Sequence, residues 1–299
     1  MGDEGGELMP TPVLLPTYTI GPWSANVVDD SGCRWLVSTQ TLTHGPGVKT
    51  HTSERPFGTG AYRARGFRTG RSDTLTGTCE GLSWATREQA RNTLLGLFGT
   101  GDQMPLSIYN GLSTRTINVE LNDITHVDVW ADGLGFDWQL SLFAADPRFL
   151  DSAVQTAGAT VVSTSTDGLD WATGGGLDWS TGGGLNWGTS GSTGLLSMTN
   201  SGTAPTWPVF RISGPMTNPT LTDPTTGNVI AYTGFVDVGQ TLVIDCSPFT
   251  RTVNLNGIDR SGALSSAAWI QIPAGGTTVL QFSGSGAGSL TASWQSAYF

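Results

Sequence analysis

Apolar and polar residues alternate with a period of two along several stretches of this 299-residue chain, and such alternation predicts half-buried strands. The clearest case is "FDWQLSLFAADPRF" at residues 136–149. Its apolar face is expected to hold Phe136, Trp138, Leu140, Leu142 and Ala144. Shorter alternation over residues 117–121 and 127–129 predicts two further strands. Asp-Ser-Gly at residues 30–32 predicts a hairpin turn.

A period of 3.6 is clear in one place, "TREQARNTLLGLF" at residues 86–98. Thr86 is a candidate N-cap, and Gln89 stands three places later, as in a capping box. One apolar face is expected to hold Ala90, Leu94, Leu97 and Phe98. The first half of the chain therefore predicts a sheet with one packed helix.

The last hundred residues consist of short alternating runs separated by Gly, Pro, Asn and Asp, which is typical of an antiparallel β-sandwich. Asn256-Gly257 predicts a two-residue hairpin turn. The predicted fold is mainly β. It has an α+β domain at 1–150, a Gly/Trp-repeat connector at 151–205 and an antiparallel sandwich at 206–299.

Composition narrows the classes of function. The formal charge of -10 argues against nucleic acid as the main partner, because phosphate binding depends on clustered Lys and Arg. The three cysteines, Cys33, Cys79 and Cys246, fit neither a disulfide framework nor a paired metal-ligand spacing, so we expect buried free thiols. The N-terminal stretch is acidic and broken by prolines, unlike a signal peptide, which predicts synthesis in a reducing cytoplasm and no membrane partner.

The chain carries no constellation that predicts catalysis, a cofactor or a metal. His44, His51 and His126 lie in separate segments without a metal-binding spacing, and no nucleophile elbow or phosphate-binding loop is present. Asp167, Asp170 and Asp178 are candidates for the paired carboxylates of a glycoside hydrolase, because tryptophans that could stack on sugars lie near them. A glycine-rich string would hold them poorly, since catalytic groups need rigid support.

The segment "RPFGTGAYRARGFRTGR" concentrates positive charge in an acidic chain. We consider two hypotheses, a basic hairpin that binds an acidic partner or nucleic acid, and a solvated or subunit-facing loop that balances the charge of an acidic chain. The net negative charge favours the second over nucleic-acid binding, and a contact between copies of the protein stays open because arginine is enriched at interfaces. The candidate inter-subunit residues are Arg55, Arg63, Arg65, Arg68 and Arg71.

The stretch "DGLDWATGGGLDWSTGGGLNWG", residues 167–188, repeats a Leu-x-Trp unit every eight residues. Exposed indoles would be costly on a flexible string, whereas burial against a neighbouring domain or subunit would offset the entropy of ordering it. A carbohydrate platform is an alternative. The candidate subunit-packing strap comprises Leu169, Trp171, Leu177, Trp179, Leu185 and Trp187.

The order of these segments resembles the distal tail proteins of long flexible-tailed bacteriophages, in the form found in actinobacteriophages. The resemblance runs through the strand at 136–149, the Trp-Gly connector, "MTNSGTAPTWPVFRISGPMTNPTLTDPTTG" from residue 198, "GQTLVIDCSPFTRTVNLNG", "WIQIPAGGTTVLQFSG" and the terminal "SWQSAYF". It covers most of the chain and depends on the order of elements more than on any single motif. The long connector departs from the shortest members of that family.

The resemblance implies a non-enzymatic structural protein of the virion tail tip. Such proteins form a hexameric ring from the N-terminal domain and carry a C-terminal galectin-like sandwich. The implied partners are the tail tube protein above, a hub or fibre protein below, the tape measure protein and receptor-binding proteins, while DNA transits without specific binding. The alternative from another class is a lectin-like carbohydrate-binding module, suggested by the sandwich and by Trp207, Trp269 and Trp294.

Overall fold

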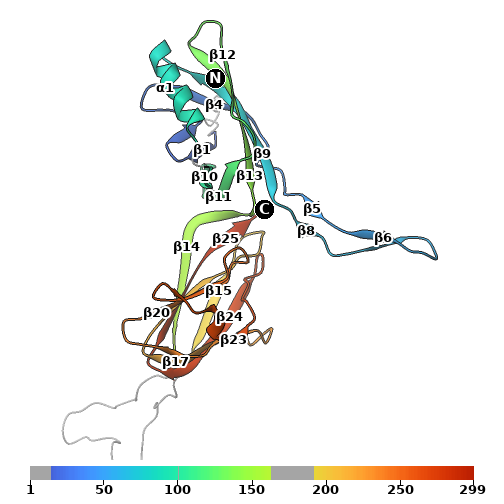
Figure 1. Cartoon of the computed structure of the whole chain (residues 1–299), viewed down its shortest axis with the longest axis vertical. Helices are drawn as coiled ribbons and strands as arrows, with labels where there is room; N and C mark the ends of the chain where they lie inside the picture. Colours follow the sequence, from blue (N-terminus) through green and yellow to red (C-terminus); the bar gives the residue numbers. More distant parts are fainter. Residues whose placement is uncertain (1–14, 100, 163–191) are drawn as a thin grey trace, which may run out of the picture. The chain divides into compact units, whose positions relative to one another are not determined.

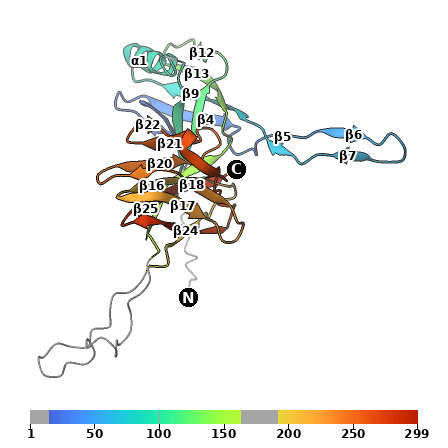
Figure 2. The same cartoon turned by 60° about the horizontal axis from the view of Figure 1, so that its bottom comes forward.

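The structure is a computed structural model that describes residues 15–99, 101–162 and 192–299. These residues form two compact units that meet in sequence between Ser152 and Ala153, and Phe299 is grouped with the first. Figure 1 shows the elements of both units, and Figure 2 shows them from a second direction. We call them unit 1 and unit 2. Within the described residues, no helix combines the length and apolarity needed to cross a membrane.

The division differs from the predicted one, which began the sandwich at residue 206. Strands β14 (Phe149–Thr160) and β15 (Leu195–Thr199) fall largely in the predicted connector, yet both supply strands to unit 2. The reason is visible in β15, where Leu196 and Met198 are buried in the core of unit 2. Its partner β24 lies about eighty residues further along the chain, so local sequence could not assign it to the sandwich.

Unit 1 is an antiparallel assembly with the strand order β14-β11-β13-β9-β4-β3. Strand β12 pairs with the beginning of β13 and β11 with its end, and β11 continues through β10 and β1 to β2. The remaining bounds in this assembly are β1 Thr17–Ile20, β2 Trp23–Ala25, β3 Val27–Val28, β4 Arg34–Gln40, β9 Arg71–Glu80, β10 Met104–Tyr109, β11 Thr114–Leu121, β12 His126–Val129 and β13 Gly135–Ala144.

The core of unit 1 follows from the period of two. All five residues of the predicted apolar face on β13, from Phe136 to Ala144, are buried, which confirms that prediction. The centre of the core is a cluster of aromatic rings. Trp23 packs edge-to-face on Trp35 and Trp138, with centroid separations of 5.8 and 5.2 Å. Such perpendicular contacts are favoured by the quadrupoles of the rings.

Helix α1 (Trp84–Leu95) begins and ends earlier than predicted. Its N-cap is Ser83, whose hydroxyl accepts a hydrogen bond from the Thr86 N–H, while the Thr86 hydroxyl accepts one from the Ser83 N–H. Thr86 is therefore the third helical residue of a capping box and not the cap itself. The predicted apolar residues Ala90, Leu94, Leu97 and Phe98 are all buried, but only Ala90 and Leu94 lie on the helix, because Leu97 and Phe98 follow its end.

Unit 2 is an antiparallel sandwich of two sheets around one core. One sheet has the order β22-β21-β20-β16-β25-β14 and the other β15-β24-β17-β18-β23, with β19 paired to β17. The bounds are β16 Val209–Ser213, β17 Met216–Thr222, β18 Val229–Tyr232, β19 Phe235–Val236, β20 Thr241–Asp245, β21 Thr252–Leu255, β22 Ile258–Asp259, β23 Leu264–Ala267, β24 Thr277–Gly286 and β25 Ser289–Tyr298. A short 3-10 helix, η1, spans Ser261–Ala263.

The predicted hairpin turn in unit 2 is confirmed. Asn256 and Gly257 both have positive φ, 47° and 84°, and they connect β21 to β22 where Leu255 pairs with Ile258. This is the conformation that a type I′ turn demands at both central positions.

The three cysteines are free and buried, as the sequence predicts. Burial raises the pKa of Cys246 to about 12, and burial together with the neighbouring Cys33 and Asp29 raises the pKa of Cys79 as well. A thiol pKa that is higher in the folded state favours folding fully below the unfolded thiol pKa of about 8.5. That contribution is lost as the pH rises towards the folded pKa.

We therefore expect the free energy of unfolding to fall between pH 9 and pH 11, because the unfolded chain ionises its thiols there. Cys246→Ala should make the fall in the free energy of unfolding less steep by about 1.4 kcal/mol per pH unit, because one thiol ionisation contributes that slope. Urea unfolding of both proteins across this pH range measures the difference. Equal slopes in the wild type and the variant would contradict the expectation.

Candidate assembly surfaces

A long hairpin of unit 1, which we call the arm, comprises residues 47–69 between β4 and β9. Figures 1 and 2 both show it extending away from the sheet of unit 1. Its paired segments are β5 (Val48–Lys49) with β8 (Phe67–Arg68), and β6 (Thr52–Glu54) with β7 (Ala61–Arg63). Backbone hydrogen bonds from Ala64 N–H to His51 O and from Thr69 N–H to Gly47 O connect the two strands between and below these segments.

The arm has no core of its own. Every residue from 51 to 68 is exposed, including Phe57 at 94%, Tyr62 at 62% and Phe67 at 69%. The guanidinium of Arg55 lies 5.1 Å from the centroid of the Tyr62 ring. A two-stranded hairpin is marginally stable by itself in water. Aromatic residues and arginine are both enriched at protein–protein interfaces relative to the rest of a protein surface.

The structure separates Arg71 from the other four predicted arginines. Arg55, Arg63, Arg65 and Arg68 lie on the arm and are exposed, whereas Arg71 is only 4% exposed at the start of β9. Arg71 is therefore unavailable to a partner in this conformation. Its burial depends on a carboxylate two residues along the same face, which a pattern of arginines does not reveal.

Arg71 and Asp73 form a buried ion pair beneath the arm. The Arg71 Nε donates to Asp73 Oδ2 at 2.5 Å, and Arg71 Nη2 donates to the carbonyls of Leu42 and His44 at 2.6 and 2.9 Å. The Thr41 hydroxyl donates to Asp73 Oδ1 at 3.2 Å. These bonds join the segment that enters the arm to the segment that leaves it. The pair thus fastens the base of the arm to the body of unit 1.

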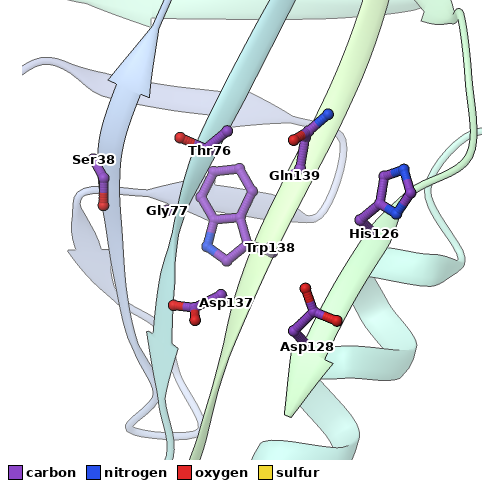
Figure 3. A pocket seen from close by; sticks show the side chains of 8 residues that line it. All are labelled: Ser38, Thr76, Gly77, His126, Asp128, Asp137, Trp138 and Gln139. Carbon is purple, nitrogen blue, oxygen red and sulfur yellow. The ribbon is translucent and has the colours of Figure 1, made fainter. Parts of the chain in front are cut away.

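One face of the β4-β9-β13-β12 sheet is polar. On β9, Thr74, Thr76 and Thr78 alternate with buried residues, and on β13 the exposed or half-buried positions include Asp137 and Gln139. A cavity of about 430 Å³ opens on this face. Figure 3 shows the side chains that line it. It is lined by Ser38, Thr76, Gly77, His126, Asp128, Asp137, Trp138 and Gln139.

The cavity brings two carboxylates together on neighbouring strands. Asp128 of β12 pairs in register with Asp137 of β13, and His126 pairs with Gln139. Like charges placed directly opposite each other in a sheet are destabilising, so the negative charge on this surface lowers the stability of unit 1. Within the described residues, no group of three or more His, Cys, Asp or Glu is placed to hold a metal ion. The cavity is therefore a concave polar surface that exposes hydroxyl and carboxylate groups to solvent.

The three tryptophans considered for a carbohydrate platform all contact the core of unit 2, and Trp294 is buried in it. Trp294 is 7% exposed, and its indole N–H donates to Thr199 O at 2.8 Å. Trp207 and Trp269 are half-buried and pack against the core of unit 2, with the Arg251 guanidinium 5.8 Å from the Trp269 ring centroid. These contacts give Trp294 a structural role. The candidate strap, from Leu169 to Trp187, lies outside the described residues.

Comparison with known proteins agrees with this architecture. Residues 201–298, about a third of the chain, match the family described as the C-terminal domain of siphovirus-type tail components. The crystal structure of the Dit protein of phage SPP1, described as a paradigm of the hub adsorption apparatus in phages that infect Gram-positive bacteria, has a TM-score of 0.65. The identity is 14%, over 96% of this chain and 100% of that chain.

The chain resembles the distal tail proteins. Chains of the phage p2 baseplate in its activated conformation share the fold as well. The chain in the form with Ca has a TM-score of 0.52 at 11% identity, covering 94% of this chain and 98% of that chain. The form with Sr gives 0.51 at 10%, covering 93% and 98%. No curated protein matches the sequence.

The resemblance to distal tail proteins that the sequence indicates is therefore supported by the fold. Both units are covered, since the SPP1 Dit match spans nearly the whole chain. Sequence reasoning missed three features of the surface: the length of the arm, the ion pair at its base and the concentration of carboxylates on one face of the unit 1 sheet. The arginine-rich segment was the one signal that pointed to the arm.

Proposed function

We propose that this protein is a structural component of a phage tail tip, a distal tail protein that assembles as a hexameric ring between the tail tube and the tip apparatus. The observation that carries the proposal is the fold, which matches SPP1 Dit over 96% of this chain. The family match to siphovirus-type tail components in residues 201–298 supports it independently at the level of sequence. The role requires no catalytic group.

A ring needs surfaces that differ on the two sides of each subunit, because a heterologous contact closes only when one side fits the other. The exposed arm supports such a contact. Its arginines and aromatic rings suit a neighbouring copy, as the sequence-based hypothesis for Arg55, Arg63, Arg65 and Arg68 proposes. The implied neighbours are the tail tube protein on one side of the ring, a hub or fibre protein on the other, and receptor-binding proteins at the sandwich.

The polar face of the unit 1 sheet suits the lumen of the ring, through which the tape measure protein and then DNA pass. Hydroxyls of β9 and the carboxylates Asp128 and Asp137 offer a surface without clustered cations to hold phosphates. The net charge of -10 acts in the same direction. DNA can then slide past this face without specific binding.

The mass of the purified protein in solution tests the proposal. Light scattering should give about six times the 31.3 kDa of one chain, and negative-stain images should show six-fold rings with a central opening. Addition of the tail tube protein encoded with it should stack or cap these rings. A chain that stays monomeric at high concentration and with each neighbouring tail protein would contradict the ring.

A further inference from the structure

Unit 1 exposes three large apolar side chains at the end where β9 finishes and α1 begins. Leu82, Trp84 and Leu134 are 79%, 66% and 48% exposed, and we call them the Trp84 patch. The Gly81 N–H donates to Leu134 O at 2.9 Å, which places the chain before α1 beside the turn between β12 and β13. Figure 1 shows α1 and β12 at the same end of the unit 1 sheet. Exposed apolar groups gathered in this way mark interaction surfaces in soluble proteins.

Carboxylates border the patch. Glu80 is the last residue of β9 and is exposed, and Asp132 accepts a hydrogen bond from the Leu134 N–H at 2.9 Å. The nearest cation on α1, Arg87, forms an ion pair with Glu88 at 3.1 Å, while its guanidinium lies 5.8 Å from the Trp84 ring centroid. Exposed apolar side chains with carboxylates on the adjoining residues form a surface that favours a partner presenting an aromatic ring and a guanidinium together.

The arm carries the complementary groups. Lys49 and four arginines against Glu54 alone give residues 47–69 a formal charge of +4, so the rest of the chain, which totals -10, carries -14. Phe57 at the tip is 94% exposed, and Arg55 stands two residues before it. A basic aromatic tip is complementary in charge and polarity to an acidic and apolar surface of the same protein.

The arm and the patch lie at opposite ends of one strand. The base of the arm lies next to Arg71, where β9 starts, and the patch follows Glu80, where β9 ends. Ten residues of strand span roughly 33 Å. Figures 1 and 2 show the arm directed away from the sheet that carries the patch, so the arm tip does not meet the patch of its own subunit. A head-to-tail contact between two copies is heterologous and closes into a ring when its rotation allows.

We propose that the Trp84 patch receives the arm tip of a second copy, with Phe57 against Trp84 and Arg55 against Glu80 or Asp132. This inference rests on the proposed ring, since it names the surfaces through which neighbouring subunits meet. The partner is therefore an identical chain, recognised by an aromatic ring and a guanidinium presented together on a hairpin.

Cross-linking of the full chain tests the contact. The native cysteines are buried, so two exposed positions can be made reactive, Thr59→Cys at the arm tip and Ala85→Cys beside Trp84. The two variants, purified separately, mixed and treated with a short bismaleimide, should form a covalent dimer. The matched control pairs Thr59→Cys with Val238→Cys, which is 73% exposed on unit 2 and should remain uncross-linked.

Assembly provides the second measurement. Trp84→Ala should raise the protein concentration needed for assembly by at least about 30-fold, the effect expected of an interface hot spot. Leu112→Ala, at a residue 94% exposed on the β10–β11 turn, should assemble like the wild type.

The outcomes separate this inference from the proposed function. Rings that form with no cross-link between residues 59 and 85, and that persist unchanged in Trp84→Ala, would overturn the Trp84 patch as the acceptor and leave the ring standing. A wild-type protein that forms no oligomer alone or with its neighbouring tail proteins would overturn both. A cross-linked dimer together with weakened assembly of Trp84→Ala would support both.

Discussion

Asp73→Ala is expected to destabilise unit 1 by about 3–5 kcal/mol, the cost of leaving one member of a buried ion pair without its partner. Arg71 would keep its charge at 4% exposure, with only two carbonyl oxygens and the Phe149 ring, 4.7 Å from its guanidinium, to replace the carboxylate. In a unit of about 150 residues, this corresponds to a fall in melting temperature on the order of 10 °C.

Differential scanning calorimetry of the full chain measures this loss, because the transition of unit 2 serves as an internal reference. Asp30→Ala is the matched control, since Asp30 is an exposed carboxylate of the same unit and its loss should change stability by less than about 0.5 kcal/mol. Replacing both partners, as in Arg71→Met with Asp73→Leu, should recover part of the loss, because no unpaired charge remains. Equal melting temperatures for Asp73→Ala and Asp30→Ala would show that the pair is not coupled to the fold.

The sequence predicted the buried faces of the strands well, because one-sided burial imposes a period of two. On β13, each buried residue from Phe136 to Ala144 follows that period, and the Asn256-Gly257 turn is specified by backbone conformation alone. These features depend on neighbours in sequence. One amino-acid sequence is therefore sufficient to predict them.

Other features depend on contacts between distant segments, and the sequence could not supply them. Arg71 looked like its neighbours in an arginine-rich run, yet its burial depends on Asp73 and on carbonyls almost thirty residues earlier. The helix start was misplaced because Ser83 and Thr86 are both capping residues, and the choice between them depends on where the preceding strand ends. Strand β15 was assigned to the connector because its partner in β24 is far along the chain.

The sequence indicated a basic hairpin, but the length of the arm escaped prediction for a different physical reason. A hairpin that buries neither face in its own subunit has no hydrophobic period, so residues 51–68 offer only composition as a signal. The aromatic and basic residues of such a hairpin lack the alternation that marks a core. A run of glycine, arginine and aromatic residues between two strands with strong alternation is therefore itself a sign of a protruding hairpin.

Removal of the arm is expected to abolish ring assembly while leaving the subunit folded. The design follows from the hydrogen bond between Thr69 N–H and Gly47 O, 3.0 Å, which closes the base of the arm. Replacement of residues 48–68 by Asn-Gly provides a two-residue type I′ turn at that closed position. Because every residue from 51 to 68 is exposed, the deletion removes no core and should change the melting temperature of unit 1 by only a few degrees, roughly the effect of about 1 kcal/mol.

Light scattering of the deleted protein should then give the mass of one chain at concentrations where the wild type forms rings. A second variant keeps the arm but reverses its charge, with Arg55, Arg63, Arg65 and Arg68 changed to Glu, and should also remain monomeric if the arm binds an acidic neighbour. Its matched control changes the same four residues to Lys, which retains the charge and should retain assembly at low ionic strength.

Rings that persist without the arm would place the subunit contact elsewhere in unit 1. Loss of rings in the deletion together with their survival in the charge-reversed variant would assign the contact to the apolar side chains of the arm. These are Val48, Phe57, Tyr62 and Phe67, the exposed large hydrophobic residues that the second variant keeps and the first removes.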